Sequence, residues 1–174
     1  MSTATWNIDS SHSSIDFTVK HMGLFTVRGS LGTISGCATT DGEAITGATL
    51  SIDISTISTG NEQRDAHVKS ADFLNVAEFP TVEFKSTSVE AKGDSEFAVT
   101  GDFTLHGVTK SITLTVSAVA PVKDPWGNSR AGVTGSGTLL RSEYGLTYNS
   151  VLETGHALIS DEIKFTFDIQ AVAA

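Results

Sequence analysis

The stretch IKFTFDI, residues 163–169, indicates the fold class, because apolar and polar side chains alternate strictly along it. Alternation with a period of two is typical of a strand that buries one face and exposes the other. The same alternation returns at residues 15–19, 50–54, 82–84, 97–105 and 112–116. Thr, Val, Ile and Phe dominate these runs, and they suit a pleated, half-buried surface. The pattern predicts an antiparallel sheet with one wet face.

Turn-forming residues separate these runs, as at Asp41-Gly42 and at residues 124–128. The sequence predicts eight or nine strands, near residues 5–9, 12–20, 25–38, 45–55, 80–91, 95–105, 109–120, 128–141 and 158–171. Several exceed ten residues, or roughly 33 Å at about 3.3 Å per residue. Strands of this length favour a tall up-and-down barrel over a compact sandwich.

Glycines inside the predicted strands are expected at bulges and barrel corners, where a sheet bends. They are also compatible with weak edge strands. These glycines are Gly29, Gly32, Gly36, Gly101, Gly132, Gly135 and Gly137.

One segment departs from the strand pattern. Thr59 and Glu62 stand at capping-box spacing, and good helix formers without proline follow them. We therefore expect a short helix near residues 60–71. The irregular stretch over residues 72–80 should pack over something hydrophobic, such as an open barrel end. It carries more apolar side chains than a surface loop usually shows: Phe73, Leu74, Val76 and Phe79.

The composition limits the classes of partner. The chain has 174 residues, the length of one domain, and 11 Lys and Arg against 20 Asp and Glu give a net charge of −9. This charge argues against binding to nucleic acid or to an anionic membrane surface. No run approaches the ~20 apolar residues of a spanning helix, and residues 1–6 do not resemble a signal peptide. We expect a cytoplasmic protein that is not transmembrane. The single cysteine, Cys37, excludes an internal disulfide and a cysteine-built zinc site.

Motifs of common enzyme classes are missing from the sequence, including the P-loop, the dinucleotide-binding glycine motif, HExxH and GxSxG. The histidines are scattered without the short spacing of a metal motif: His12, His21, His67, His106 and His156. The densest polar cluster is RDAH at residues 64–67. On a helix, Arg64 and His67 share a face. The cluster is compatible with a solvated helix face, or with a polar clasp at a cavity mouth or at the barrel rim.

Motifs along almost the whole chain appear in the order of a known family. They are WNID at residues 6–9, residues 12–22, 60–67, 70–76 and 79–86, GDFTLHGVTK at residues 101–110 and RSEYG at residues 141–145. In this order they resemble the YceI-like, polyisoprenoid-binding proteins. The departures are small: Ser10 and Ser111 stand where proline is common, and Tyr144 replaces a usual phenylalanine.

The resemblance implies that residues 1–174 form a single domain, an elongated eight-stranded antiparallel up-and-down barrel that is lipocalin-like in shape. Its lumen would be an apolar tunnel for a long isoprenoid, such as an isoprenoid quinone, or another lipid. Each buried methylene would contribute about 0.8 kcal/mol. The implied function is non-catalytic lipid binding, transport or storage, without a cofactor or metal. The family also makes a homodimer plausible.

The candidate ligand-binding residues are apolar positions of the predicted strands: Phe17, Val19, Leu50, Ile52, Phe84, Phe103, Leu105, Ile112, Leu114, Val116, Phe165 and Phe167. The candidate polar clasp comprises His12, Arg64, Asp65, His67 and His106. The residues also allow two other functions besides lipid binding. One is a metal- or haem-binding protein or enzyme that uses histidines inside the barrel, and the other is an interaction module with a filled lumen.

Overall fold

The computed structural model describes residues 2–150, 152 and 157–174. Within these residues the chain forms ten strands, one α-helix and three short 3-10 helices. The strands are β1 (Thr3–Ile8), β2 (Ser14–His21), β3 (Phe25–Ser30), β4 (Thr33–Asp41), β5 (Ala44–Asp53), β6 (Thr81–Ala91), β7 (Glu96–Leu105), β8 (Val108–Lys123), β9 (Ser129–Leu140) and β10 (Ile159–Ala173). The helices are α1 (Glu62–Lys69) and the 3-10 turns Ser10–His12, Ile54–Thr56 and Arg141–Tyr144.

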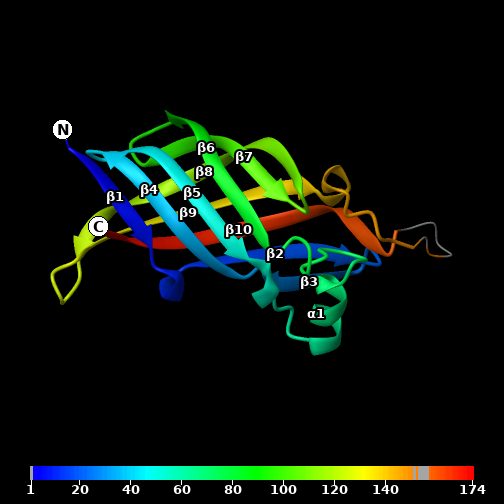
Figure 1. The fold of residues 1–174 in the computed structure, drawn as a ribbon. Helices are drawn as coiled ribbons and strands as arrows, with labels where there is room; N and C mark the ends of the chain where they lie inside the picture. Colours follow the sequence, from blue (N-terminus) through cyan, green and yellow to red (C-terminus); the bar gives the residue numbers. More distant parts are fainter. Residues whose placement is uncertain (1, 151, 153–156) are drawn as a thin grey trace.

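Eight strands form a closed antiparallel barrel (Figure 1), which confirms the predicted fold class. Strands β4 to β10 pair in sequence order, and β1 pairs with both β4 and β10. The barrel is closed by the pairing of β1 with only the last part of β10, where Ala171 lies opposite Ile8. Earlier in β10, Phe165 lies opposite Phe17 of β2. The β2–β3 hairpin therefore continues the barrel wall beyond the end of β1.

The buried face of each strand follows the alternation in the sequence. Along β7, Phe97, Val99, Phe103 and Leu105 are buried, whereas Asp102 on the opposite face is exposed. Because every second residue points inward, the strands give the barrel a mainly apolar interior.

The predicted strand over residues 25–38 is in fact two strands, β3 and β4. Gly32 lies between them with φ of +148°. A Cβ atom at this position would lie 2.1 Å from the carbonyl oxygen of Asp53. Only glycine tolerates this backbone conformation and this approach, so the chain turns here. Side-chain alternation carries no sign of such a backbone contact.

The in-strand glycines have two roles in the structure, and the sequence predicted the first of them. Gly101 and Gly132 pair with residues that flank bulges in β6 and β8, as predicted for positions where a sheet bends. Gly29, Gly135 and Gly137 lie beside phenylalanine rings of the neighbouring strand, and so does Gly101, beside Phe84.

The predicted helix is present as α1 and is shorter than expected. Its N-cap is Asn61, whose side chain accepts a hydrogen bond from the Arg64 backbone N–H at 3.0 Å. The capping box predicted from Thr59 and Glu62 is wrong, because the Thr59 hydroxyl is bonded to the side chains of Arg64 and Asp65. In the described part of the chain, no helix has the length and apolar character needed to cross a bilayer.

The stretch after α1 packs against the barrel, as its apolar composition predicted. Leu74 is buried, and Val76 lies against the hydrophobic core. The backbone N–H of Leu74 donates to the carbonyl of Val68 in α1 at 3.0 Å. The helix and this stretch therefore form one unit beside β2 and β3 (Figure 1).

Candidate functional site

Two cavities lie within the part of the barrel that the structure describes. The terminal cavity has a volume of about 230 Å³ and is lined by residues such as Trp6 and Phe167. The helix cavity has a volume of about 540 Å³ and is lined by residues such as Arg64 and Tyr148. Three residues line both cavities, and we call this set the waist: Ile15, Phe103 and Phe165.

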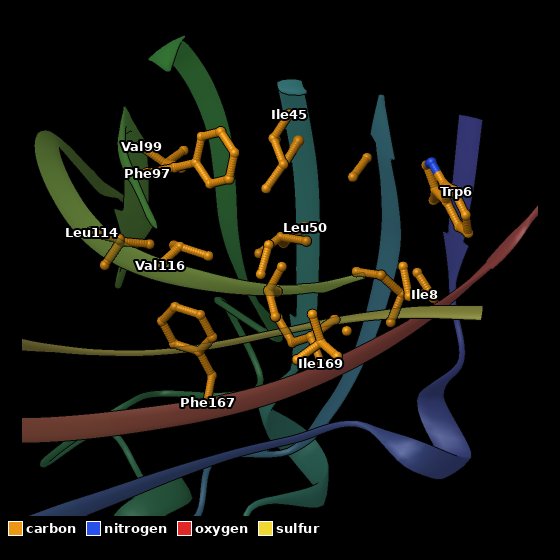
Figure 2. A pocket seen from close by; sticks show the side chains of 18 of the residues that line it. Trp6, Ile8, Ile45, Leu50, Phe97, Val99, Leu114, Val116, Phe167 and Ile169 are labelled. Carbon is orange, nitrogen blue, oxygen red and sulfur yellow. The ribbon is translucent and has the colours of Figure 1, made fainter. Parts of the chain in front are cut away.

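The wall of the terminal cavity is built from strands on all sides of the barrel. Figure 2 shows Phe97 and Val99 of β7 together with Val116 of β8, while Trp6 approaches the same space from β1. The Trp6 indole N–H donates to the Thr40 hydroxyl at 3.0 Å, which satisfies the polar group of an otherwise apolar lining side chain.

All twelve apolar residues predicted from the sequence line at least one of these cavities. Leu50, Ile52, Phe84, Ile112, Leu114, Val116 and Phe167 line the terminal cavity; Phe17, Val19 and Leu105 line the helix cavity; Phe103 and Phe165 line both. Their contact with a ligand stays a prediction. Several further residues line the cavities beyond those predicted, among them Trp6, Phe97, Ile169 and Tyr148. The first three follow the same alternation that located the others.

Phenylalanine rings lie against the barrel wall where the neighbouring strand has glycine. Phe165 is opposite Gly137, and a Cβ atom on that glycine would lie 2.4 Å from the Phe165 Cζ atom. Phe167 and Gly135 form a second such pair, at 2.3 Å. The glycines therefore leave room for the rings beside the wall, so that the rings do not have to fill the lumen.

Arg64 and Asp65 of α1 converge on Thr59. The Asp65 carboxylate accepts from the Thr59 N–H at 2.7 Å and from its hydroxyl at 2.6 Å. Arg64 donates to the same hydroxyl at 2.8 Å and to the Thr59 carbonyl at 2.7 Å. The hydrogen bonds from Thr59 lower the pKa of Asp65. Ser58, next to Thr59, pairs with Ser30 of β3, so these bonds anchor the helix to the end of the barrel.

His67 belongs to a different set of contacts on the same helix. Its Nε2 atom lies 2.9 Å from a carboxylate oxygen of Asp72. Its ring packs edge-on against Phe73 and Tyr148, with centroid distances of 4.9 and 5.2 Å. This aromatic group lines the helix cavity, so His67 lies at that cavity through packing rather than through a bond to Arg64.

The other two histidines of the candidate clasp have separate partners, so the five residues are not one cluster. His12 pairs with Asp9 at 2.9 Å in the turn after β1. His106 lies in the β7–β8 turn, where its Nδ1 atom is 3.0 Å from the Tyr144 carbonyl and its ring packs against Phe79. Among the described residues, no group of three or more His, Cys, Asp and Glu side chains is arranged to hold a metal ion. His156 lies outside the described residues.

Arg141, the first residue of the RSEYG motif, also lines the helix cavity, which the sequence does not predict. It is 4% exposed, and its guanidinium donates to the carbonyls of Leu146 at 2.7 Å, Ser160 at 3.0 Å and Ile159 at 3.3 Å. Burial lowers its pKa from the ordinary value. The charge is thus held rigidly next to an apolar space.

At the other end of the barrel, Arg130 bridges two carboxylates. It donates to Asp124 at 2.7 Å and to Asp9 at 2.8 Å. The bond from Arg130 lowers the pKa of Asp124 to about 2. Bonds from Ser11, then His12 and Arg130, hold the pKa of Asp9 well below its usual range. These bonds tie the β8–β9 turn to the end of β1.

Proteins of related sequence share this chain over most of its length. A family model described as the YceI-like domain matches residues 6–171. The UPF0312 protein of Shewanella sp. (strain ANA-3) is 41% identical over 149 residues, which cover 83% of this chain and 78% of that protein. The UPF0312 protein of Shewanella baltica (strain OS155) is 38% identical with the same coverage.

Solved structures share the fold. BcnA of Burkholderia cenocepacia superposes with a TM-score of 0.81 at 19% identity, covering 94% of this chain and 98% of that one. A polyisoprenoid binding domain from Saccharophagus degradans gives a TM-score of 0.75 at 18% identity, with coverage of 98% and 99%. Because the family model spans residues 6–171 and the Shewanella relatives agree over most of that range, the chain belongs to the YceI-like domain family.

Proposed function

We propose that the protein binds a long-chain isoprenoid or another lipid inside the barrel and acts as a non-catalytic carrier or store of that lipid. The observation that carries this proposal is the waist, where Ile15, Phe103 and Phe165 line both cavities. A long chain that passes these three side chains would occupy both apolar cavities, which neither cavity alone could hold in full.

The size of the tunnel suits a long hydrocarbon. Lining residues of β10 extend from Ile159 to Ala171, about 40 Å of strand at about 3.3 Å per residue. Because strands of such barrels tilt by roughly 40°, this corresponds to about 30 Å along the axis, similar to the ~30 Å hydrocarbon core of a bilayer. At about 0.8 kcal/mol for each buried methylene, a chain of this length is held without many polar contacts, although ordering the chain offsets part of the gain.

The comparisons with known proteins also support the proposal of a lipid-binding protein. One structure with this fold is described as a polyisoprenoid binding domain, and an apolar lumen is what such a ligand requires. The geometry does not favour the metal- or haem-binding alternative, because His12, His67 and His106 have separate partners. We therefore propose a binding protein rather than an enzyme.

The test is organic extraction of the native purified protein followed by mass spectrometry. The proposal predicts a long-chain lipid in near-stoichiometric amount, and transfer of labelled lipid between two vesicle populations when protein is added. A protein that carries no lipid and binds no added isoprenoid would overturn the proposal. The homodimer and the cytoplasmic location stay predictions, which light scattering and fractionation of the native host would check.

A further inference from the structure

Large apolar side chains are exposed on the β8–β9 hairpin. Val119 is 62% exposed, Val122 is 64% exposed and Trp126 is 80% exposed. The hairpin projects past the end of the barrel at which both chain termini lie (Figure 1). A single exposed apolar side chain is ordinary, whereas several on one projecting hairpin mark a surface that contacts an apolar partner.

The turn that carries Trp126 is held in one shape. The Asp124 carboxylate accepts hydrogen bonds from the backbone N–H groups of Trp126 and Asn128, both at 2.9 Å, and from Arg130 at 2.7 Å. Gly127 has φ of +88°, a backbone conformation that favours glycine. The turn therefore presents the exposed indole without a further loss of backbone freedom when a partner binds.

The apolar surface of the hairpin continues into the lumen. Val119, Ala120 and Pro121 all line the terminal cavity, and all three are also exposed. The pairing of β8 with β9 is irregular just after Val119, so the strand leaves its regular alternation at the end of the barrel. The same cavity extends to the β4–β5 and β6–β7 turns, at Glu43 and Asp94. The terminal cavity therefore opens at this end of the barrel, beside the hairpin.

A second apolar tip lies at the opposite end of the molecule, in the β2–β3 turn (Figure 1). Leu24 is 84% exposed there, and Phe25 is exposed as well. Neither is among the described residues that line the two cavities. This tip lacks the continuity with the lumen that the β8–β9 hairpin has, so it supplies a matched control.

The charges at the terminal end favour a partner without net negative charge. The described charged residues that line the terminal cavity are acidic, Glu43 and Asp94, and the chain has a net charge of −9. An anionic membrane surface would repel these groups. Tryptophan is enriched where a bilayer meets water, because the indole has an apolar body and a polar N–H. A zwitterionic bilayer therefore suits both the charge and the exposed side chains of this end.

We propose that the β8–β9 hairpin docks the terminal end of the barrel onto a zwitterionic bilayer, and that an apolar chain passes there directly between the bilayer and the terminal cavity. This rests on the proposed function and adds the surface through which the lipid is exchanged. Trp126 and Val122 enter the headgroup region, and Val119 and Pro121 lead from it to the lumen. A chain that follows this path stays out of water during the exchange.

The first test is flotation of the purified protein with phosphatidylcholine vesicles. The wild type should bind, and its tryptophan emission should shift to shorter wavelength. Trp126→Ser should bind roughly tenfold more weakly or worse, because an inserted indole buries a large apolar area. Leu24→Ser, at the opposite tip, should bind like the wild type. No binding by the wild type, undiminished binding by Trp126→Ser, an equal loss in Leu24→Ser, or binding that requires anionic lipid would each overturn the proposal.

The second test uses two variants of β8 that add the same charge. Val122 and Thr113 are both exposed, and Thr113 lies on the outer wall of the barrel, away from the hairpin. Val122→Asp should lose vesicle binding, because the carboxylate opposes insertion into an apolar layer. Thr113→Asp should retain it. An equal loss in the two variants would reduce the effect to net charge and overturn the proposal.

The third test separates docking from lipid binding by following labelled geranylgeraniol. Trp126 and Val122 are not among the described lining residues, so Trp126→Ser loaded in detergent should hold as much of this lipid as the wild type. Its transfer of the lipid to phosphatidylcholine vesicles should slow in proportion to its loss of vesicle binding. Equal transfer rates would overturn the proposed exchange route and leave the proposed function intact. If neither protein holds the lipid, the proposed function fails, and the exchange route fails with it.

Discussion

At the scale of single residues, the barrel separates neighbours in sequence into two environments. Leu114 is buried and lines the terminal cavity. Thr113 is exposed, and its hydroxyl lies 2.8 Å from that of Thr100 on the adjacent strand. The two side chains belong to the same strand and differ only in the face that carries them. A charge introduced at one position therefore meets a low-dielectric interior, and at the other it meets water.

We expect Leu114→Asp or Phe165→Asp to abolish co-purified lipid, because an unpaired carboxylate in the lumen costs several kcal/mol. Phe165→Leu should retain lipid. Thr113→Asp and Thr166→Asp, on the outer face, should keep the lipid and change stability by less than about 1 kcal/mol. The measurement is lipid content by mass spectrometry, with thermal unfolding to confirm the fold. Equal loss of lipid in Thr113→Asp and Leu114→Asp would contradict the assignment of faces.

A second prediction at this scale concerns Gly137. The added methyl group of Gly137→Ala would lie 2.4 Å from the Phe165 ring, so the ring must move into the waist. We expect a loss of stability of about 1–3 kcal/mol and a shift of the bound lipids toward shorter chains. Gly93→Ala is the control, because nothing lies within 4 Å of its added methyl group. An unchanged chain-length profile in Gly137→Ala would show that the waist does not limit the ligand.

At the scale of elements, α1 depends on the contacts of Thr59. Asp65→Ala should lower stability by about 1–3 kcal/mol, because the Thr59 N–H and hydroxyl, which are mostly buried, lose their acceptor. Denaturant unfolding measures this. Asp72→Ala is the matched control: its contact with His67 is exposed, and exposed pairs contribute less than about 1 kcal/mol. If the two variants were equally stable, Asp65 would not be the anchor of the helix.

The β8–β9 turn should make stability depend on pH. Arg130 lowers the pKa of Asp124 from 3.8 to about 2. A carboxylate with a lowered pKa stabilises the fold above its unfolded pKa, and that contribution is lost as the pH falls through its folded pKa. Between about pH 4 and pH 2, Tm should therefore fall more steeply in the wild type than in Asp124→Asn. Parallel Tm curves for the two proteins over this range would refute a stabilising role for this carboxylate.

At the scale of the whole molecule, the lumen links lipid binding to stability. The walls of an empty apolar tunnel lack contacts that a bound chain supplies, and a ligand that binds only the folded state stabilises it. Lipid at 100 times its Kd should add about 2.7 kcal/mol, or roughly 5–10 °C in Tm for a chain of this size. Calorimetry of delipidated and reloaded protein measures this difference. Leu114→Asp should show no such increase, and an equal increase there would place the lipid outside the barrel.

The sequence by itself determined the strands, the short helix and the inward face of most of the wall. Strand alternation depends on each residue and its immediate neighbours, so it appears directly in a stretch such as residues 163–169. The sequence also shows the RDAH cluster, but it predicts a capping role for Thr59, which in the fold is bonded to Arg64 and Asp65. The spacing of Thr59 and Glu62 shows that a capping hydrogen bond can form. It does not show which of the possible hydrogen bonds of Thr59 forms in the folded protein.

Only the tertiary structure decided which residues meet across the barrel. The barrel closes where β1 pairs with β10. The register of β9 against β10 places Gly137 beside Phe165. The fold brings Arg141 to the cavity that Arg64 borders, far apart in sequence. It also separates His12 from His67 and His106. These outcomes depend on strand register and barrel closure, which arise from many weak contacts between distant segments, and no local pattern of side chains encodes them.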